Sequence, residues 1–119
     1  MDAVLKQCRV LDKRLLRSCI PVTVTQTGQL NIALVEESTP NLALYKILFK
    51  GWIKGCTFLD QLKTIPKDAY LYCIENYSLE QLRLENVCVL LQNMPRPMTL
   101  YFRLTEGQKL NTKGTSFNQ

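Results

Sequence analysis

Apolar residues in the second half of the chain follow the spacing of a helix that buries one face. They recur at positions i, i+3, i+4 and i+7 and are Val87, Leu90, Leu91 and Met94. Pro95 and Pro97 follow at once, and proline cannot continue a helix because it lacks the backbone N–H donor. The pattern predicts a core-facing helix that ends before Pro95.

A second helical pattern covers residues 4–16. Its apolar positions follow a 4-3-4 spacing and are Val4, Cys8, Leu11 and Leu15. The other faces of this helix carry basic residues, which are Lys6, Arg9, Lys13, Arg14 and Arg17. We expect a terminal helix that packs on the rest of the domain and cannot continue past Pro21.

Strands are expected where apolar residues alternate with polar ones or form short continuous runs. Residues 98–104 alternate without interruption, and residues 20–25 alternate apolar side chains with threonine. Gly51 and Gly55 suggest a bend or bulge in a longer mixed segment. In all we expect five strands, at residues 20–25, 30–35, 70–74 and 98–104 and in the second half of residues 42–53.

Polar and turn-forming residues predict the links between these elements. Residues 36–41 are expected to form a loop, and Glu75 and Asn76 a turn. Thr57 is expected to cap a short helix over residues 57–62. Residues 105–119 are polar with little to bury, so we expect them to be disordered.

The expected order is a helix, three strands, a short helix, a strand, a helix and a strand. Most links are too short for a crossover between parallel strands, so the sheet is expected to be largely antiparallel. A chain of 119 residues supports one hydrophobic core. The fold class is therefore mixed α/β of the α+β kind, with a basic amphipathic N-terminal helix at residues 1–17, a domain at residues 18–104 and a tail at residues 105–119.

The residue types that most enzymatic chemistry needs are missing or scattered. The chain has no histidine, so it has no imidazole general base or metal ligand. Glu36 and Glu37 are the only adjacent carboxylates, and neighbours on a strand point to opposite faces. The odd number of cysteines and the lack of a C-x-x-C pair argue against disulfides and zinc; they are Cys8, Cys19, Cys56, Cys73 and Cys88. We expect no enzyme, no catalytic or metal-binding residue and no cofactor.

Positive charge is concentrated at the N-terminus. The net charge is +5, and residues 1–17 carry five basic and two acidic side chains, a net charge of +3. The middle of the chain is nearly neutral, so nucleic-acid binding is not expected. No apolar run approaches the ~18 residues of a membrane span, and no signal-peptide block precedes the domain. We therefore expect a cytoplasmic protein.

The last strand, turn, helix and link occur in a distinctive order. Residues 70–76 (YLYCIEN) give a strand and turn, residues 85–91 (ENVCVLL) a helix, and residues 96–100 (RPMTL) a link into the final strand. This order and these motifs resemble the closing half of a PDZ domain. The resemblance covers about residues 18–104.

The first half of this region also resembles the family at one loop. Residues 28–34 (GQLNIAL) resemble the carboxylate-binding loop and second strand, with Gln29, Leu30, Asn31 and Ile32 at the four loop positions. The sequence departs from the family at Asn31, which replaces a loop glycine, and it has no Lys or Arg between Ser18 and Ala43. Asparagine is among the few other residues that tolerate a positive φ.

The resemblance implies a small, largely antiparallel, partly open barrel of five to six short strands with two helices, to which the N-terminal helix is added. It also implies a non-enzymatic adaptor that binds C-terminal peptides, or an internal β-strand, by strand addition. Backbone N–H groups at Leu30, Asn31 and Ile32 would bind the carboxylate. The expected peptide-binding residues are Leu30, Asn31, Ile32, Leu34, Leu84, Cys88 and Leu91.

Leu84 predicts the specificity of such a groove. Many PDZ domains carry histidine at the matching position and bind a ligand hydroxyl two residues before the terminus. Leucine has no polar atom, so we expect an apolar ligand residue there.

The sequence is also compatible with two other functions. In one, the domain no longer binds carboxylates and serves as a scaffold or a homodimerisation domain. In the other, the basic N-terminal helix contacts anionic lipid or RNA phosphates. Salt separates these functions, because binding through several phosphate contacts weakens steeply with salt and strand addition does not.

Overall fold

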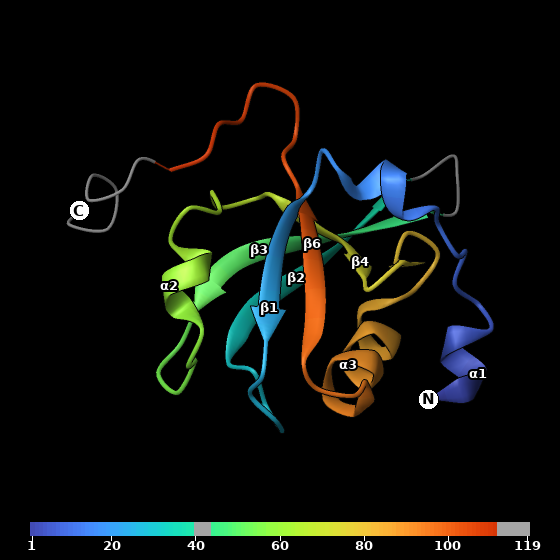
Figure 1. Cartoon of the computed structure of the whole chain (residues 1–119). Coiled ribbons are helices and arrows are strands. Elements are labelled where there is room, and N and C mark those ends of the chain that lie inside the picture. The colour runs from blue at the N-terminus through green and yellow to red at the C-terminus, as the bar shows by residue number, and fades with distance from the viewer. Residues whose placement is uncertain (40–43, 112–119) are drawn as a thin grey trace.

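Six strands form one antiparallel sheet in residues 1–39 and 44–111, the part of the chain that this computed structural model describes (Figure 1). They are β1 (Ile20–Val24), β2 (Ile32–Thr39), β3 (Leu44–Trp52), β4 (Tyr70–Ile74), β5 (Tyr77–Ser78) and β6 (Met98–Arg103). The strand order is β1-β6-β4-β3-β2, and β5 pairs with β4. Every pairing between them is antiparallel, as the short links predict. The α+β class is confirmed.

The described residues also form short helices around the sheet. These are α1 (Asp2–Leu5), a 3-10 helix η1 (Lys13–Leu16), α2 (Leu59–Leu62) and α3 (Leu84–Asn93). Figure 1 shows α2 and α3 on either side of the β1–β6 pair, with α1 beside α3. None of these helices has the length and apolar character that crossing a bilayer requires.

One face of α3 and one face of β6 belong to the core, and both elements follow their predicted patterns. Val87 and Leu90 on α3 are completely buried, as are Leu100 and Phe102 on β6. The Phe102 ring meets Phe49 of β3 edge-on, with centroids 5.5 Å apart. Each such side chain contributes about 1.5–3 kcal/mol when fully buried. The ring contact joins β6 to β3 inside the core.

β2 extends further than its composition suggests. Residues 36–39 were expected in a loop, but they continue the ladder with β3, in which Glu36 pairs with Ile47 and Thr39 with Leu44. The Thr39 hydroxyl also donates to the Leu44 carbonyl at 2.8 Å. The loop prediction is wrong here because polar side chains suit a strand at a sheet edge. The rest of the expected loop, Pro40 and Asn41, lies outside the described residues.

The bulge expected near Gly51 is confirmed. Ala33 of β2 pairs with Gly51, while Leu34 pairs with Phe49, so Lys50 is an additional residue on β3. Gly51 has a φ of +116°, a value that residues other than glycine rarely adopt. The bulge therefore lies opposite the start of β2.

The prediction of one helix over residues 4–16 is wrong. α1 ends at Leu5, and Val10 forms an antiparallel bridge with Tyr77 of β5. The Ser78 N–H donates to the Arg9 carbonyl, and the Leu11 N–H donates to Asn76, both at 2.8 Å. Helical spacing is a local signal, and here backbone pairing with β5 outweighs it.

The burial of two neighbouring leucines reflects this change. Leu15 was expected on the apolar face, yet it is 57% exposed, whereas Leu16 is 5% exposed. Leu16 packs with Leu11 against Tyr72 and Cys73 of β4. The N-terminal segment is therefore part of the sheet's packing, and its basic residues do not share one helix.

The segment after β6 is partly ordered, which corrects the prediction of disorder for residues 105–111. The Asn111 N–H donates to the Thr64 carbonyl at 2.9 Å, and Gln108 Nε2 donates to Lys67 at 2.8 Å. Gln108 Oε1 also accepts from the Thr105 N–H at 2.8 Å. Residues 112–119 of the expected tail lie outside the described residues.

We expect Asn111→Ala to lower the melting temperature by about 4 °C. The amide Nδ2 of Asn111 donates to the carbonyls of Lys63 and Ile65, at 3.2 and 3.3 Å. Losing both bonds should remove about 1 kcal/mol of stability. Scanning calorimetry measures the shift, and Lys109→Ala, at an exposed site, is the control. Equal melting temperatures for the two variants would show that this contact does not stabilise the fold.

Candidate functional site

A cavity of about 280 Å³ lies between α3 and the sheet end formed by β2. β2 is last in the strand order and pairs with β3 alone among the described strands, so its other edge is open. All seven residues expected to contact a peptide line this cavity; they are Leu30, Asn31, Ile32, Leu34, Leu84, Cys88 and Leu91. The structure thus brings one loop and the strand that follows it together with a helix that lies far from both in the sequence.

The loop before β2 has the backbone conformation that glycine favours. Asn31 has a φ of +59°, in the left-handed region that asparagine tolerates better than most residues. Its carbonyl accepts a hydrogen bond from the Ile53 N–H at 2.8 Å. The N–H groups of Leu30 and Asn31 donate to no group in the described part of the chain. Two amide donors beside the cavity are therefore free to bind an anion.

The side chain of Gln26 holds this loop against the loop that follows β3. Its Nε2 donates to the carbonyls of Gln29 at 2.7 Å and Gly55 at 3.2 Å. Its Oε1 accepts from both the N–H and the hydroxyl of Thr57, at 2.8 and 2.7 Å. The expected Thr57 cap is wrong, because this hydroxyl bonds to Gln26 and α2 begins at Leu59 without a side-chain cap.

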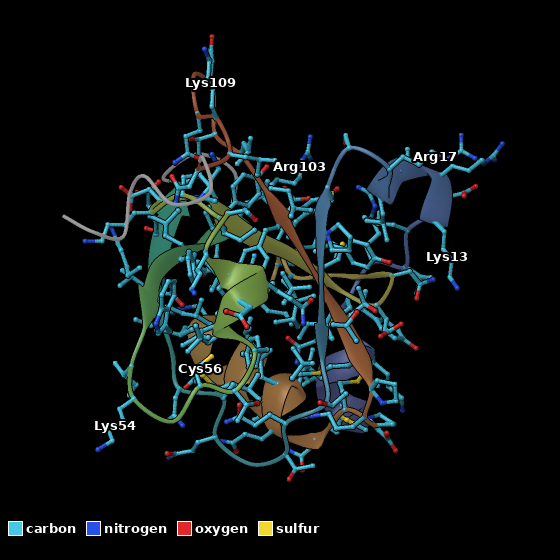
Figure 2. All side chains as sticks on the ribbon, turned by 60° about the vertical axis from the view of Figure 1, so that its left-hand side comes forward. Lys13, Arg17, Lys54, Cys56, Arg103 and Lys109 are labelled. Carbon is cyan, nitrogen blue, oxygen red and sulfur yellow. The ribbon has the colours of Figure 1, made fainter. Side chains whose placement is uncertain are left out.

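Gly55 fits closely against Asn31. A Cβ at Gly55 would lie 2.6 Å from the Asn31 side-chain nitrogen, and the φ of +104° at this position also favours glycine. The side chain of Asn31 is therefore packed against the β3–α2 loop. Figure 2 shows Lys54 projecting outward from that loop and Cys56 turned inward.

Arg96 links the loop to the end of α3. Its guanidinium donates to three backbone carbonyls at 2.6 Å each, those of Gln26, Leu91 and Met94. The carbonyls in the last turn of a helix have no partner within the helix, so an arginine there satisfies them. Both the loop and the helix end thus depend on one side chain.

α3 forms one wall of the cavity with side chains that are three or four residues apart in the sequence. Leu84 is partly buried, Cys88 is more exposed one turn later, and Leu91 is 5% exposed. Leu84 and Cys88 thus lie at the edge of the buried stripe of α3, to which Leu91 belongs. Partial burial raises the pKa of the Cys88 thiol above its ordinary value, so the thiol stays protonated at neutral pH.

Glu36 connects β2 to the start of α3. Arg83 Nε donates to both carboxylate oxygens of Glu36, at 2.9 and 3.0 Å, and the Leu84 N–H donates to one of them at 2.8 Å. These hydrogen bonds, with Arg83 first and the Leu84 amide second, hold the pKa of the Glu36 carboxyl below its ordinary value. No pattern in the sequence predicts this contact, which joins residues 47 positions apart.

Four further residues line the cavity and were not among the expected peptide-binding residues. They are Gly28, Gln29, Ile53 and Gln92. Gln92 lies one helical turn after Cys88, so extending the helical spacing would have found it. No sequence pattern indicates Ile53, because its position beside the cavity depends on its contact with Asn31. No charged side chain of the described residues lines the cavity.

The remaining chemistry-bearing groups are dispersed. All five cysteines are free thiols, and burial raises the pKa of Cys73 to about 12. The described residues contain no group of three or more His, Cys, Asp or Glu side chains that could hold a metal ion. The cavity therefore presents apolar surface and backbone amide donors to a ligand.

The basic N-terminal residues lie apart from this cavity. Lys6 follows α1 as its C-cap, and Arg14 pairs with Asp12 at 2.8 Å. Figure 2 shows Lys13 and Arg17 directed away from the body of the molecule. Contact with an anionic membrane through these side chains and Arg9 stays a prediction, now without a continuous helix to carry it.

Comparison with models of known protein families gave no match for this chain, and comparison with curated proteins gave none either.

We expect Asn31→Ala to lower the free energy of unfolding by about 1 kcal/mol, because alanine keeps the Cβ that crowds the following carbonyl oxygen at this φ but lacks the polar side chain that makes the left-handed region tolerable for asparagine. Asn31→Gly should have a smaller effect, since glycine adopts the left-handed region readily. Urea unfolding of both variants measures the difference. If Asn31→Ala proved as stable as Asn31→Gly, the loop would not hold the conformation described.

Proposed function

We propose that the chain is a PDZ-like interaction module, without enzymatic activity, that binds the C-terminal segment of a partner protein. The partner strand would add to the open edge of β2, beside α3. One observation carries the proposal: all seven residues chosen from the family resemblance line a single cavity next to an edge strand.

The loop supports recognition of a free carboxylate. The unpaired N–H groups of Leu30 and Asn31 lie at one end of the cavity, and the Ile32 N–H follows in the chain. Consecutive amides in a loop with a left-handed residue form a concave site for an anion. Hydrogen bonds to a carboxylate are charge-assisted, so amide donors can hold it without a basic side chain in the cavity.

The cavity walls support apolar side chains at two ligand positions. Leu30, Ile32 and Leu91 surround the end next to the loop, where the last side chain of a peptide would lie. Leu34 and Leu84 lie further along, where the side chain two positions earlier would point, because alternate residues of a strand share a face.

We expect a peptide with a free C-terminus to bind about 10- to 150-fold more tightly than the same peptide with an amidated terminus. The ratio corresponds to the ~1.5–3 kcal/mol typical of a hydrogen bond to a charged group. Isothermal titration calorimetry with both forms of a peptide that has leucine at its last and third-last positions measures it. Equal affinities would exclude carboxylate recognition. If neither form binds, the scaffold or homodimer function takes its place.

We expect Leu84→His to shift preference toward serine or threonine at the third-last ligand position, by about tenfold for 1.4 kcal/mol. Leucine can bury an apolar side chain there, whereas a hydroxyl gains no partner. Titrating wild type and variant with two peptides that differ only at that position measures the shift. Cys88→Ala is the control, because it keeps the site apolar. An unchanged preference in Leu84→His would mean that this side chain does not face the ligand.

A further inference from the structure

The segment between α1 and β1 exposes two large apolar side chains. Val10 is 62% exposed and Leu15 is 57% exposed, whereas the residues that follow each of them, Leu11 and Leu16, are buried against β4. Each exposed side chain keeps apolar area that a binding partner could cover. Isolated exposed leucines are common on protein surfaces, so the charge around these two side chains decides what they can bind.

The charge of this segment is strongly positive. Residues 9–17 hold four basic side chains and one acidic side chain, a net charge of +3. The acidic side chain, Asp12, is paired with Arg14 at 2.8 Å, so each cancels the charge of the other. In the part of the chain that the structure describes, the other three form no ion pair; they are Arg9, Lys13 and Arg17.

The 3-10 helix η1 places an apolar and a basic face side by side. Such a helix has three residues per turn, so side chains three positions apart share a face. Leu16 faces the sheet, Arg14 and Arg17 share a second face, and Leu15 lies on the third. Figure 2 shows Lys13 and Arg17 directed away from the body of the molecule. Leucine and arginine thus project outward together from a single turn.

Hydrogen bonds hold this segment in place before anything binds. The Asp12 side chain accepts from the Arg14 N–H and its carbonyl accepts from the Leu15 N–H, both at 2.9 Å. The Arg9 carbonyl accepts from the Ser78 N–H of β5 at 2.8 Å. A surface that is already ordered loses little conformational entropy on binding.

The segment lies away from the peptide cavity and outside the region that resembles a known family. In Figure 1, η1 is the blue turn at the upper right, whereas the loop before β2 and helix α3 lie at the bottom. The segment also precedes residue 18, where the resemblance begins. A ligand on η1 would therefore leave the cavity open.

We propose that residues 9–17 form a docking surface for an anionic lipid bilayer. Leu15 and Val10 enter the headgroup region, while the basic side chains around them contact lipid phosphates. Apolar insertion favours a membrane over RNA, because residues 9–17 contain no aromatic side chain on which a base could stack. The proposal does not depend on peptide binding.

Vesicle flotation with the full chain tests this proposal. The vesicles are phosphatidylcholine alone, or phosphatidylcholine with about one third phosphatidylserine. We expect the protein to partition into the anionic vesicles at least about tenfold more strongly, and the difference to shrink as salt is added. Lys13→Gln and Arg17→Gln should each weaken anionic binding about fivefold, which corresponds to about 1 kcal/mol per basic side chain.

Matched controls separate this surface from general effects of charge and hydrophobicity. Leu15→Ser should weaken binding to anionic vesicles at least about threefold, whereas Leu110→Ser, at a site that is 51% exposed, should not. Lys54→Gln is the control for Lys13→Gln, because Figure 2 shows Lys54 projecting from a loop at the opposite side of the molecule. Circular dichroism checks that each variant is folded.

Three outcomes would overturn the proposal. The first is equal partitioning of wild type into neutral and anionic vesicles, or no binding to either. The second is a Leu15→Ser variant that binds anionic vesicles as well as Leu110→Ser, because the apolar side chain would then not enter the bilayer. The third is tighter binding to polyuridylate than to anionic vesicles at the same salt concentration, which would assign the positive charge to nucleic acid.

Discussion

The guanidinium of Arg96 is the interaction on which the arrangement of the cavity depends. It binds the Gln26 carbonyl and two carbonyls at the end of α3, each at 2.6 Å. Gln26 in turn fixes Gln29, Gly55 and Thr57 through its side chain. Without Arg96, three carbonyls would lose a charged donor, and a lysine could not replace its planar fork of donors. The left-handed loop and the helix therefore keep their spacing through one residue of the link between α3 and β6.

α3 is fixed at both ends, which sets the width of the cavity. Arg96 holds its last turn to the loop before β2, and Glu36 holds its first turn to the middle of β2. Between these points Val87 and Leu90 are completely buried. A cavity with fixed walls loses little conformational entropy when a ligand enters, so modest contacts can produce measurable affinity.

The sequence was sufficient where a pattern is local and repeats. Strand alternation located β6, and helical spacing located the buried stripe of α3. The family resemblance, which also rests on local motifs, selected Leu84 and Cys88 beside that stripe. The failures occur where a distant partner decides the structure. Arg9 and Leu11 pair with the β5 region, residues 36–39 pair with β3, and Asn111 binds the end of α2. Contacts such as Arg96 with Gln26, 70 positions apart, leave no periodic signal.

The pairing of residues 9–11 with β5 means that the folding unit begins earlier than the region that resembles a known family. A fragment cut at residue 18 would lose the partners of the Ser78 N–H and the Asn76 carbonyl. It would also uncover Tyr72 and Cys73, which Leu11 and Leu16 cover. A short exposed strand beside fresh apolar surface invites edge-to-edge association between molecules. Shortening the chain in this way would therefore reduce its solubility before it reduced its affinity for a ligand.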